Sequence, residues 1–239
     1  MNGFPLAGHL KEMVALPSLV AFGALWPLIP SRVRGRMFSR EGNIDRPVIC
    51  LPGYGQNDSC FLLLARRLAA KGFGPISCLQ YKPLLASIEF HAQRLARSVD
   101  RVLDRTGSRK VSLVGHSMGG IVARHYLQEQ LGLDKVDKLV TVESPHQGLT
   151  LARYGPGECA RQMDPLHPFM KKMREGLEQI AGLPILGIYS DVNPFSAKST
   201  AYQLLDGRSD CFLPGHGHVS LLLMQPVAER IISFLHEVH

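Results

Sequence analysis

This chain of 239 residues has few aromatic residues, fewer acidic than basic residues, and no recognised cysteine pattern. The five cysteines match no zinc-binding or redox spacing, although a bridge between Cys159 and Cys211 stays open. Free thiols would favour a reducing compartment. The 27 basic residues outnumber the 20 acidic ones, but no basic patch with interleaved aromatic residues indicates a nucleic-acid-binding protein. Internal repeats and low-complexity tracts are also absent from the sequence.

Charge is missing altogether from one apolar stretch near the amino terminus, Met13 to Pro30. Prolines and a glycine interrupt this stretch, and no compact basic region or small-residue cleavage site marks it as a secretory signal peptide. Three interpretations stay open: an apolar helix packed on the domain, an anchor in the membrane interface, or a membrane span. In the second, residues 13–36 contact a membrane surface, with their arginines at the lipid headgroups.

The remaining composition is that of a folded domain, with 45% hydrophobic and 20% charged residues. From Arg46 onward, short apolar runs alternate with amphipathic segments, which predicts parallel strands joined by right-handed helical crossovers. We therefore expect an α/β domain in residues 46–239, preceded by an apolar segment in residues 1–45. Strands are expected at residues 48–51, 75–79, 110–114, 138–142, 185–189 and 209–213. Helices are expected at residues 60–71, 87–105, 121–132 and 224–238.

A serine between two glycines lies where the third expected strand meets the next helix. The segment Gly-His-Ser-Met-Gly at residues 115–119 follows an apolar strand and precedes a helical run. A serine on such a sharp turn has a strained backbone, and the flanking glycines avoid collisions with the neighbouring strand and helix. The turn holds the hydroxyl of Ser117 clear of the sheet edge, so the motif indicates a nucleophile elbow.

The stretch of residues 150–183 interrupts the alternation of strands and helices. It contains several glycines and prolines, followed by an amphipathic run at residues 169–180. An insertion of this length over the carboxyl edge of a sheet is typical of a lid. A plain crossover helix with long connections is the alternative.

Four blocks, in order along the chain, carry a family resemblance. They are Leu-Pro-Gly-Tyr-Gly at residues 51–55, the serine turn at 115–120, Ser-Pro-His-Gln-Gly at 144–148, and Gly-His-Gly-His-Val-Ser-Leu-Leu at 215–222. With these blocks the chain resembles the α/β-hydrolase superfamily, specifically its compact bacterial lipase and esterase branch. The resemblance implies an α/β-hydrolase fold, with a mostly parallel sheet of about six strands flanked by helices and a short lid insertion.

Serine chemistry requires a base, because a hydroxyl is a poor nucleophile at neutral pH. In the α/β-hydrolase order, the acid and then the histidine follow the serine. His216 and His218 lie in the loop after the last expected strand, and His218 directly precedes the apolar run before the last helix. The family pattern places its catalytic histidine there, so we expect His218 to be the base, with His216 as the alternative. A metal site at these two histidines lacks an evident third ligand.

The acid is expected just after the fifth strand, where Asp191 lies. The family usually places its aspartate two residues later, and this chain has Asn193 there. Glu143, at the end of the preceding strand, is the first alternative, and Asp206 and Asp210 are further ones. We expect Asp191 to complete the triad.

An acyl-transfer site also needs hydrogen-bond donors for the oxyanion of the tetrahedral intermediate. One expected donor is the backbone N–H of Met118, directly after the nucleophile. The other is the backbone N–H of Tyr54, in the loop after the first strand. Pro52 stands where many relatives have histidine, which changes the support of this loop but removes neither donor.

Together these residues predict a serine hydrolase that cleaves carboxylic esters through an acyl-enzyme on Ser117. A thioesterase, lactonase, amidase or acyltransferase would use the same triad, and a non-catalytic lipid- or protein-binding member of the fold is a further alternative. Small-molecule or lipid esters are the expected substrates, and no cofactor, metal or nucleic acid is expected. A cytoplasmic or inner-membrane-associated location is favoured over secretion, and the sequence does not indicate an oligomeric state.

Overall fold

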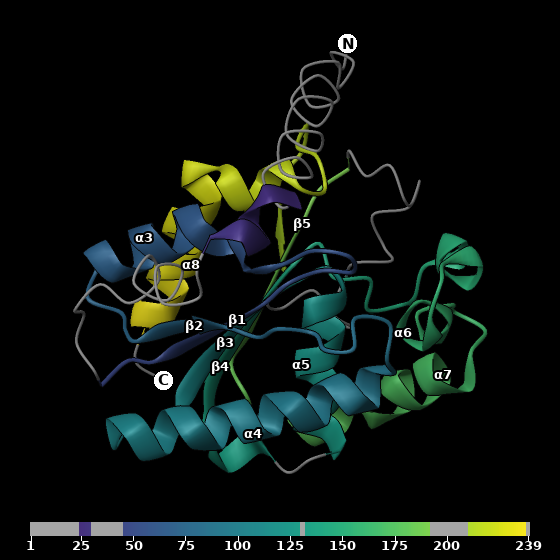
Figure 1. Ribbon diagram of the computed structural model, residues 1–239, viewed down its shortest axis with the longest axis horizontal. Coiled ribbons are helices and arrows are strands. Elements are labelled where there is room, and N and C mark those ends of the chain that lie inside the picture. The colour runs from purple at the N-terminus through teal and green to yellow at the C-terminus, as the bar shows by residue number, and fades with distance from the viewer. Residues whose placement is uncertain (1–23, 30–44, 130–131, 192–209, 238–239) are drawn as a thin grey trace.

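One parallel sheet forms the centre of the computed structural model, which describes residues 24–29, 45–129, 132–191 and 210–237 (Figure 1). Its strand order is β2-β1-β3-β4-β5-β6, and every neighbouring pair is parallel. The strands are β1 (Val48–Leu51), β2 (Ile76–Cys78), β3 (Val111–His116), β4 (Val136–Val142), β5 (Ile185–Tyr189) and β6 (Asp210–Phe212). The expected parallel sheet of six strands is confirmed, and each strand ends within two residues of its predicted bounds.

Helices cover both faces of this sheet, as an α/β fold requires (Figure 1). On one face lie α3 (Leu62–Ala70) and α8 (Gln225–His236), and on the other lie α4 (Ile88–Thr106) and α5 (Met118–Glu129). Between β4 and β5 the chain forms η4 (Thr150–Tyr154), α6 (Glu158–Gln162), α7 (Pro168–Glu175) and η5 (Gly176–Ile180). The other 3-10 helices of the described ranges are η1 (Trp26–Leu28), η2 (Asp58–Phe61), η3 (Gly132–Asp134) and η7 (Ser220–Leu223).

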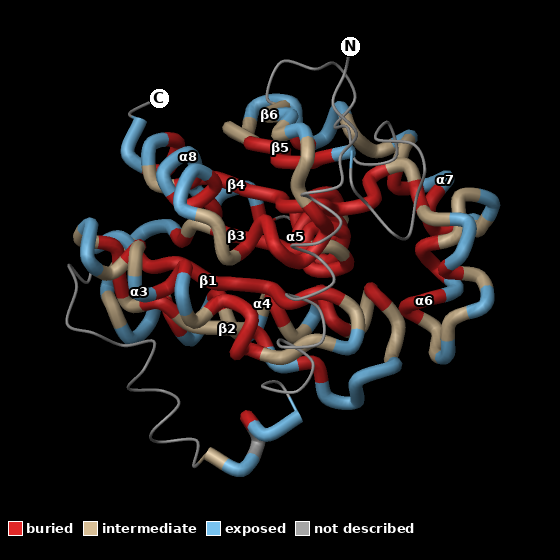
Figure 2. Tube along the Cα trace, turned by 90° about the horizontal axis from the view of Figure 1, so that it is seen from above, coloured by how far each residue is buried: buried red, intermediate tan, exposed pale blue. Residues whose placement is uncertain are grey.

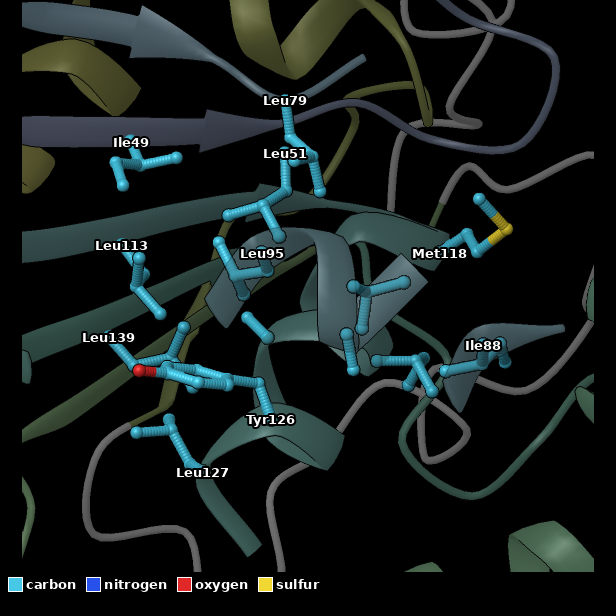
Figure 3. Close-up of a cluster of buried hydrophobic side chains, with 14 of the residues drawn as sticks. Ile49, Leu51, Leu79, Ile88, Leu95, Leu113, Met118, Tyr126, Leu127 and Leu139 are labelled. Atoms are coloured by element: carbon cyan, nitrogen blue, oxygen red, sulfur yellow. The ribbon is translucent and has the colours of Figure 1, made fainter. Parts of the chain in front are cut away.

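The strands divide their apolar side chains between two cores, one on each face. Ile49 and Leu51 of β1 belong to the core shared with α4 and α5, whereas Val48 and Cys50 belong to the core shared with α3 and α8. This division follows from the period of two along a strand. Because both faces are covered, the strands appear in the sequence as continuous apolar runs, and Figure 2 shows the central strands buried. Figure 3 shows the first core, where side chains of β1, β3 and β4 meet those of α4 and α5.

The segment between β4 and β5, expected as a lid, is anchored in the first core. Cys159 of α6 and Met170 of α7 are fully buried, and Met173 is nearly so. These apolar side chains pack with the same cluster that holds α4 and α5, so the segment is fastened at the carboxyl edge of the sheet. The lid function of residues 150–183 stays a prediction.

Trp26 ties a part of the apolar amino-terminal stretch to the domain. Its side chain is fully buried in the second core, and its indole Nε1 donates a hydrogen bond to Oδ1 of Asp58 at 2.7 Å. The neighbouring Leu25 and Leu28 are exposed. Residues 13–23 and 30–36 lie outside the described residues. Among the helices that the structure describes, none is both long and apolar enough to cross a membrane.

All five cysteines are free, so the bridge between Cys159 and Cys211 that the sequence left open is not formed. Burial raises the pKa of the Cys50 thiol to about 12. Cys50 therefore behaves as a small apolar residue of the second core.

The end of β1 and the start of α5 approach so closely that position 119 has no room for a side chain. A Cβ on Gly119 would lie 2.0 Å from the carbonyl oxygen of Leu51 and 2.7 Å from that of Pro52. Both are backbone atoms, so a side chain at this position would force the strand and the helix apart.

We therefore expect Gly119→Ala to lower the free energy of unfolding by about 3 kcal/mol or more, because the helix must shift to admit the methyl group. Gly182→Ala is the control, since a Cβ there meets nothing within 4 Å and stability should change by less than about 1 kcal/mol. Urea unfolding of both variants measures the difference. An unfolding midpoint for Gly119→Ala equal to that of the wild type would contradict this account of the β1–α5 contact.

Candidate active site

Ser117 lies on a strained turn between β3 and α5. Its φ is +52°, in the left-handed region that residues other than glycine rarely occupy. Its N–H donates to the carbonyl oxygen of Val142 at 2.8 Å, which fastens the turn to the neighbouring strand β4. A Cβ on Gly115 would lie 2.5 Å from the backbone nitrogen of Gly120, so glycine is needed two residues before the serine. The turn has the geometry expected of a nucleophile elbow.

His218 is buried in the loop after β6, and its ring lies against the residue that precedes the serine. The ring centroids of His116 and His218 are 4.9 Å apart, and Nε2 of His116 lies 2.9 Å from the carbonyl oxygen of His218. The alternative base, His216, instead has its Nδ1 2.7 Å from the carbonyl oxygen of Pro214. Of the two candidate bases, the structure brings His218 to the serine turn.

The carboxylate that meets His218 belongs to Glu143. This side chain is fully buried at the end of β4, and its Oε2 lies 3.4 Å from Nδ1 of His218. Its Oε1 accepts a hydrogen bond from the backbone N–H of Ser190 at 2.6 Å, which fixes the orientation of the carboxylate. The φ of Glu143 is +50°, so Glu143, like Ser117, lies on strained backbone at the carboxyl end of a strand.

Asp191, which we expected to be the acid, contacts the backbone of the histidine loop. Its Oδ1 accepts a hydrogen bond from the backbone N–H of Gly215 at 2.6 Å, at an exposed position. The turn after β5 thus directs this carboxylate to the backbone at the start of the histidine loop. Asp210 opens β6 opposite Gly187, and Asp206 lies outside the described residues.

The turn after β1 contacts Ser117 and presents the backbone N–H of Tyr54. Residues 53–56 form a β-turn in which Gln56 N donates to Gly53 O at 3.1 Å, and Gly55 has a φ of +71° at the third position. A Cβ on Gly53 would lie 3.1 Å from the Cβ of Ser117, so the turn and the serine are in contact. The N–H of the second residue of such a turn, here Tyr54, is not used by the turn itself.

Met118 is the first residue of α5, where a helical N–H has no acceptor within its own helix. Over the ranges that the structure describes, neither this N–H nor that of Tyr54 donates to another protein group. Two donors therefore flank Ser117, one on each neighbouring segment. An oxyanion hole is built from N–H groups of this kind.

His116 and Gln56 are two site residues that the sequence did not single out. His116 is fully buried, and its Nδ1 lies 2.8 Å from Oε1 of Gln56. The same Oε1 accepts a hydrogen bond from the backbone N–H of Gly53 at 2.9 Å. The sequence signal that could have identified His116 as a site residue is its position inside the serine motif. That signal is weak because a motif does not show which way a side chain points.

A metal-binding cluster of three or more His, Cys, Asp or Glu side chains is absent from the described part of the chain. A cavity of about 1130 Å³ lies at the amino ends of the strands, lined among others by Arg46, Lys110 and Lys138. None of the expected site residues lines it, so the cavity is separate from the serine turn.

Comparison with known proteins supports the same fold. The protein-family model described as alpha/beta hydrolase fold matches residues 47–187. The mature form of a lipase from Bacillus licheniformis superposes with a TM-score of 0.68 at 17% identity, over 81% of this chain and 95% of the lipase. A phospholipase from Legionella pneumophila gives a TM-score of 0.65 at 14% identity, over 80% of this chain and 60% of that one. A bacterial membrane phospholipase A gives a TM-score of 0.59 at 16% identity, over 96% of this chain and 97% of that one.

His116 and His146 are both fully buried, and burial favours the neutral form of each ring. Burial, together with the nearby His218, lowers the pKa of His116 to about 3. Burial and the adjacent guanidinium of Arg124 lower the pKa of His146 well below its usual value. Nε2 of His146 lies 3.1 Å from Oγ1 of Thr141. Since an unfolded histidine titrates near pH 6.5, both rings take up a proton when the chain unfolds below that pH.

We expect the free energy of unfolding to fall as the pH is lowered from 6.5 to 5, because the unfolded state then binds more protons than the folded state. With both histidines contributing, the slope approaches about 2 to 3 kcal/mol per pH unit near pH 5. Carboxylates, which titrate near pH 4, contribute less in this window. Urea unfolding at a series of pH values measures the slope. A free energy that stays constant from pH 6.5 to pH 5 would show that these histidines are not buried neutral.

Proposed function

Because the chain belongs to the α/β-hydrolase fold family, we propose that it is a serine hydrolase that cleaves carboxylic esters. In this proposal Ser117 is the nucleophile, His218 the general base and Glu143 the acid. The observation that carries it is the contact of 3.4 Å between Nδ1 of His218 and Oε2 of Glu143, beside the strained turn of Ser117. A buried carboxylate paired with an imidazole next to a serine elbow is the arrangement that activates a hydroxyl.

Acylation begins when Nε2 of His218 takes the proton of the Ser117 hydroxyl and the oxygen attacks the ester carbonyl carbon. The carbonyl oxygen becomes an oxyanion, which accepts hydrogen bonds from the N–H groups of Tyr54 and Met118. His218 returns the proton to the leaving alcohol as the ester C–O bond breaks. An acyl-enzyme on Ser117 remains.

Deacylation repeats these steps with water. His218 takes a proton from the water, whose oxygen attacks the acyl carbon, and then returns a proton to Ser117 as the carboxylic acid leaves. Glu143 accepts the Nδ1–H of His218, so that Nε2 faces the serine and the imidazolium is stabilised in both steps. The backbone N–H of Ser190 keeps Glu143 in the orientation that this contact needs.

An apolar, lipid-like acyl group is the substrate class that fits the surroundings of the site. The hydroxyl of Tyr54 donates to the carbonyl oxygen of Pro156 at 2.7 Å. The candidate lid, residues 150–183, therefore lies next to the turn of residues 53–56, which we call the oxyanion turn. Leu151 and Tyr154 of this segment are exposed. The lipase and phospholipase relatives support the same class. Contact of residues 13–36 with a membrane surface, one of the three interpretations that the sequence left open, would bring such substrates to the site.

We expect Ser117→Ala to abolish labelling by a fluorophosphonate probe and to lower the hydrolysis of nitrophenyl esters by about 10⁴-fold or more. Ser112→Ala, on the same strand, is the matched control and should keep wild-type activity. A series of acyl chain lengths, with a thioester of the best acyl group, separates an esterase from a thioesterase. Equal activity of Ser117→Ala and wild type would remove the proposed nucleophile.

Glu143→Gln and Asp191→Asn decide between the two candidate acids. Each change replaces a carboxylate by an amide of the same shape. Glu143→Gln should lower kcat by roughly 10²- to 10⁴-fold, because the amide cannot stabilise the imidazolium of His218. Asp191→Asn should cost less than about fivefold, because an amide oxygen still accepts the N–H of Gly215. The opposite order in steady-state kinetics would return Asp191 to the triad.

A further inference from the structure

His116 connects two segments that lie on opposite sides of the serine turn. One ring nitrogen faces Gln56 of the oxyanion turn, at 2.8 Å, and the other faces the carbonyl oxygen of His218, at 2.9 Å. The ring is fully buried, and it also packs on the imidazole of His218. We propose that His116 is a positioning residue that holds the His218 loop and the oxyanion turn in register with Ser117. This inference rests on the proposed function of the same site.

The ring has little freedom to take another position. A Cβ on Gly53 would lie 2.9 Å from Oε1 of Gln56, 3.1 Å from Nδ1 of His116 and 3.1 Å from Cβ of Ser117. The oxyanion turn therefore packs directly against the amide, the imidazole and the serine. Since His116 is the last residue of β3, its backbone is held by the sheet, and the ring transmits that fixed position to both segments.

The hydrogen-bond roles around the ring show what the connection requires. Oε1 of Gln56 accepts the N–H of Gly53 at 2.9 Å, so the atom that faces Nδ1 of His116 is an oxygen with one lone pair left. On the other side Nε2 also faces an oxygen, the carbonyl of His218. A neutral imidazole carries one N–H, and it can donate to one of these two oxygens at a time. In each tautomer the ring thus donates to one of the two segments, while it packs against both.

The two connections of His116 can be tested separately, because the amide side chains of asparagine and glutamine mimic its two tautomers. The amide nitrogen of asparagine at position 116 falls near the place of Nδ1, and that of glutamine falls near the place of Nε2. His116→Phe keeps an aromatic ring beside His218 but loses both ring nitrogens. His125→Phe is the matched control, since His125 is another buried histidine, on α5, whose ring packs on Phe169 at 5.1 Å.

The experiment measures ester hydrolysis, fluorophosphonate labelling, the thermal unfolding midpoint and hydrogen exchange of residues 52–57 and 215–222. We expect His116→Phe to lower kcat by about 10- to 100-fold with KM changed less than about threefold, because misplaced groups lose transition-state contacts more than substrate binding. Exchange should become faster in both segments. His116→Asn should restore protection in residues 52–57, and His116→Gln in residues 215–222, each with partial recovery of kcat. His125→Phe should leave kcat and exchange in these segments unchanged.

Gln56→Leu, alone and combined with His116→Phe, completes the test. If the two residues act as one connection, the double variant loses no more activity than the more damaged single variant. Independent, multiplying losses would contradict the connection. The connection would also be contradicted if His116→Phe lost both kcat and thermal stability and neither amide variant recovered kcat.

The outcomes separate this inference from the proposed function. A wild-type protein that neither hydrolyses the esters nor reacts with the phosphonate overturns the proposed function, and this inference with it. If the wild type is active, two results overturn this inference alone. One is a His116→Phe variant as active as the wild type, and the other is a His116→Phe variant whose exchange in residues 215–222 is unchanged.

Discussion

The tight reversal between β3 and α5 is the constraint on which the rest of the site depends. It brings the backbone of α5 against the carbonyl oxygen of Leu51, which only glycine at position 119 permits. The same reversal leaves Ser117 at a φ of +52°, and it places the N–H of Met118 at the start of a helix, where no helical carbonyl can accept it. The proposed nucleophile and one proposed oxyanion donor therefore have a common structural origin.

The parts of the fold and site that local sequence patterns determine were predictable. The six strands followed from apolar runs between amphipathic segments, because a sheet covered on both faces needs such runs. Ser117 and the loop of His218 followed from glycine-bounded motifs, since sharp turns restrict the residues that can form them. Choosing His218 over His216 relied on the apolar run that follows it, which η7 buries in the second core.

The acid could not be chosen from local patterns, because its partner comes from a distant part of the chain. Asp191 and Glu143 both follow a strand, and the sequence does not show which carboxylate faces the histidine. The structure shows that Glu143 is held by the N–H of Ser190, whereas Asp191 turns to Gly215. His116 was missed for the same reason, since its two partners lie 60 and 102 residues away.

The proposed acid, Glu143, directly follows β4, which ties the proposed reaction centre to one pair of strands. The side chains that the proposed chemistry uses come from the ends of β3 and β4, together with the loop that leads to η7. His116 and Val142 are paired across β3 and β4, and the N–H of Ser117 donates to the carbonyl oxygen of Val142. A shift in register between these two strands would therefore separate Ser117 from Glu143. This one strand pair thus sets the spacing of the proposed reaction centre.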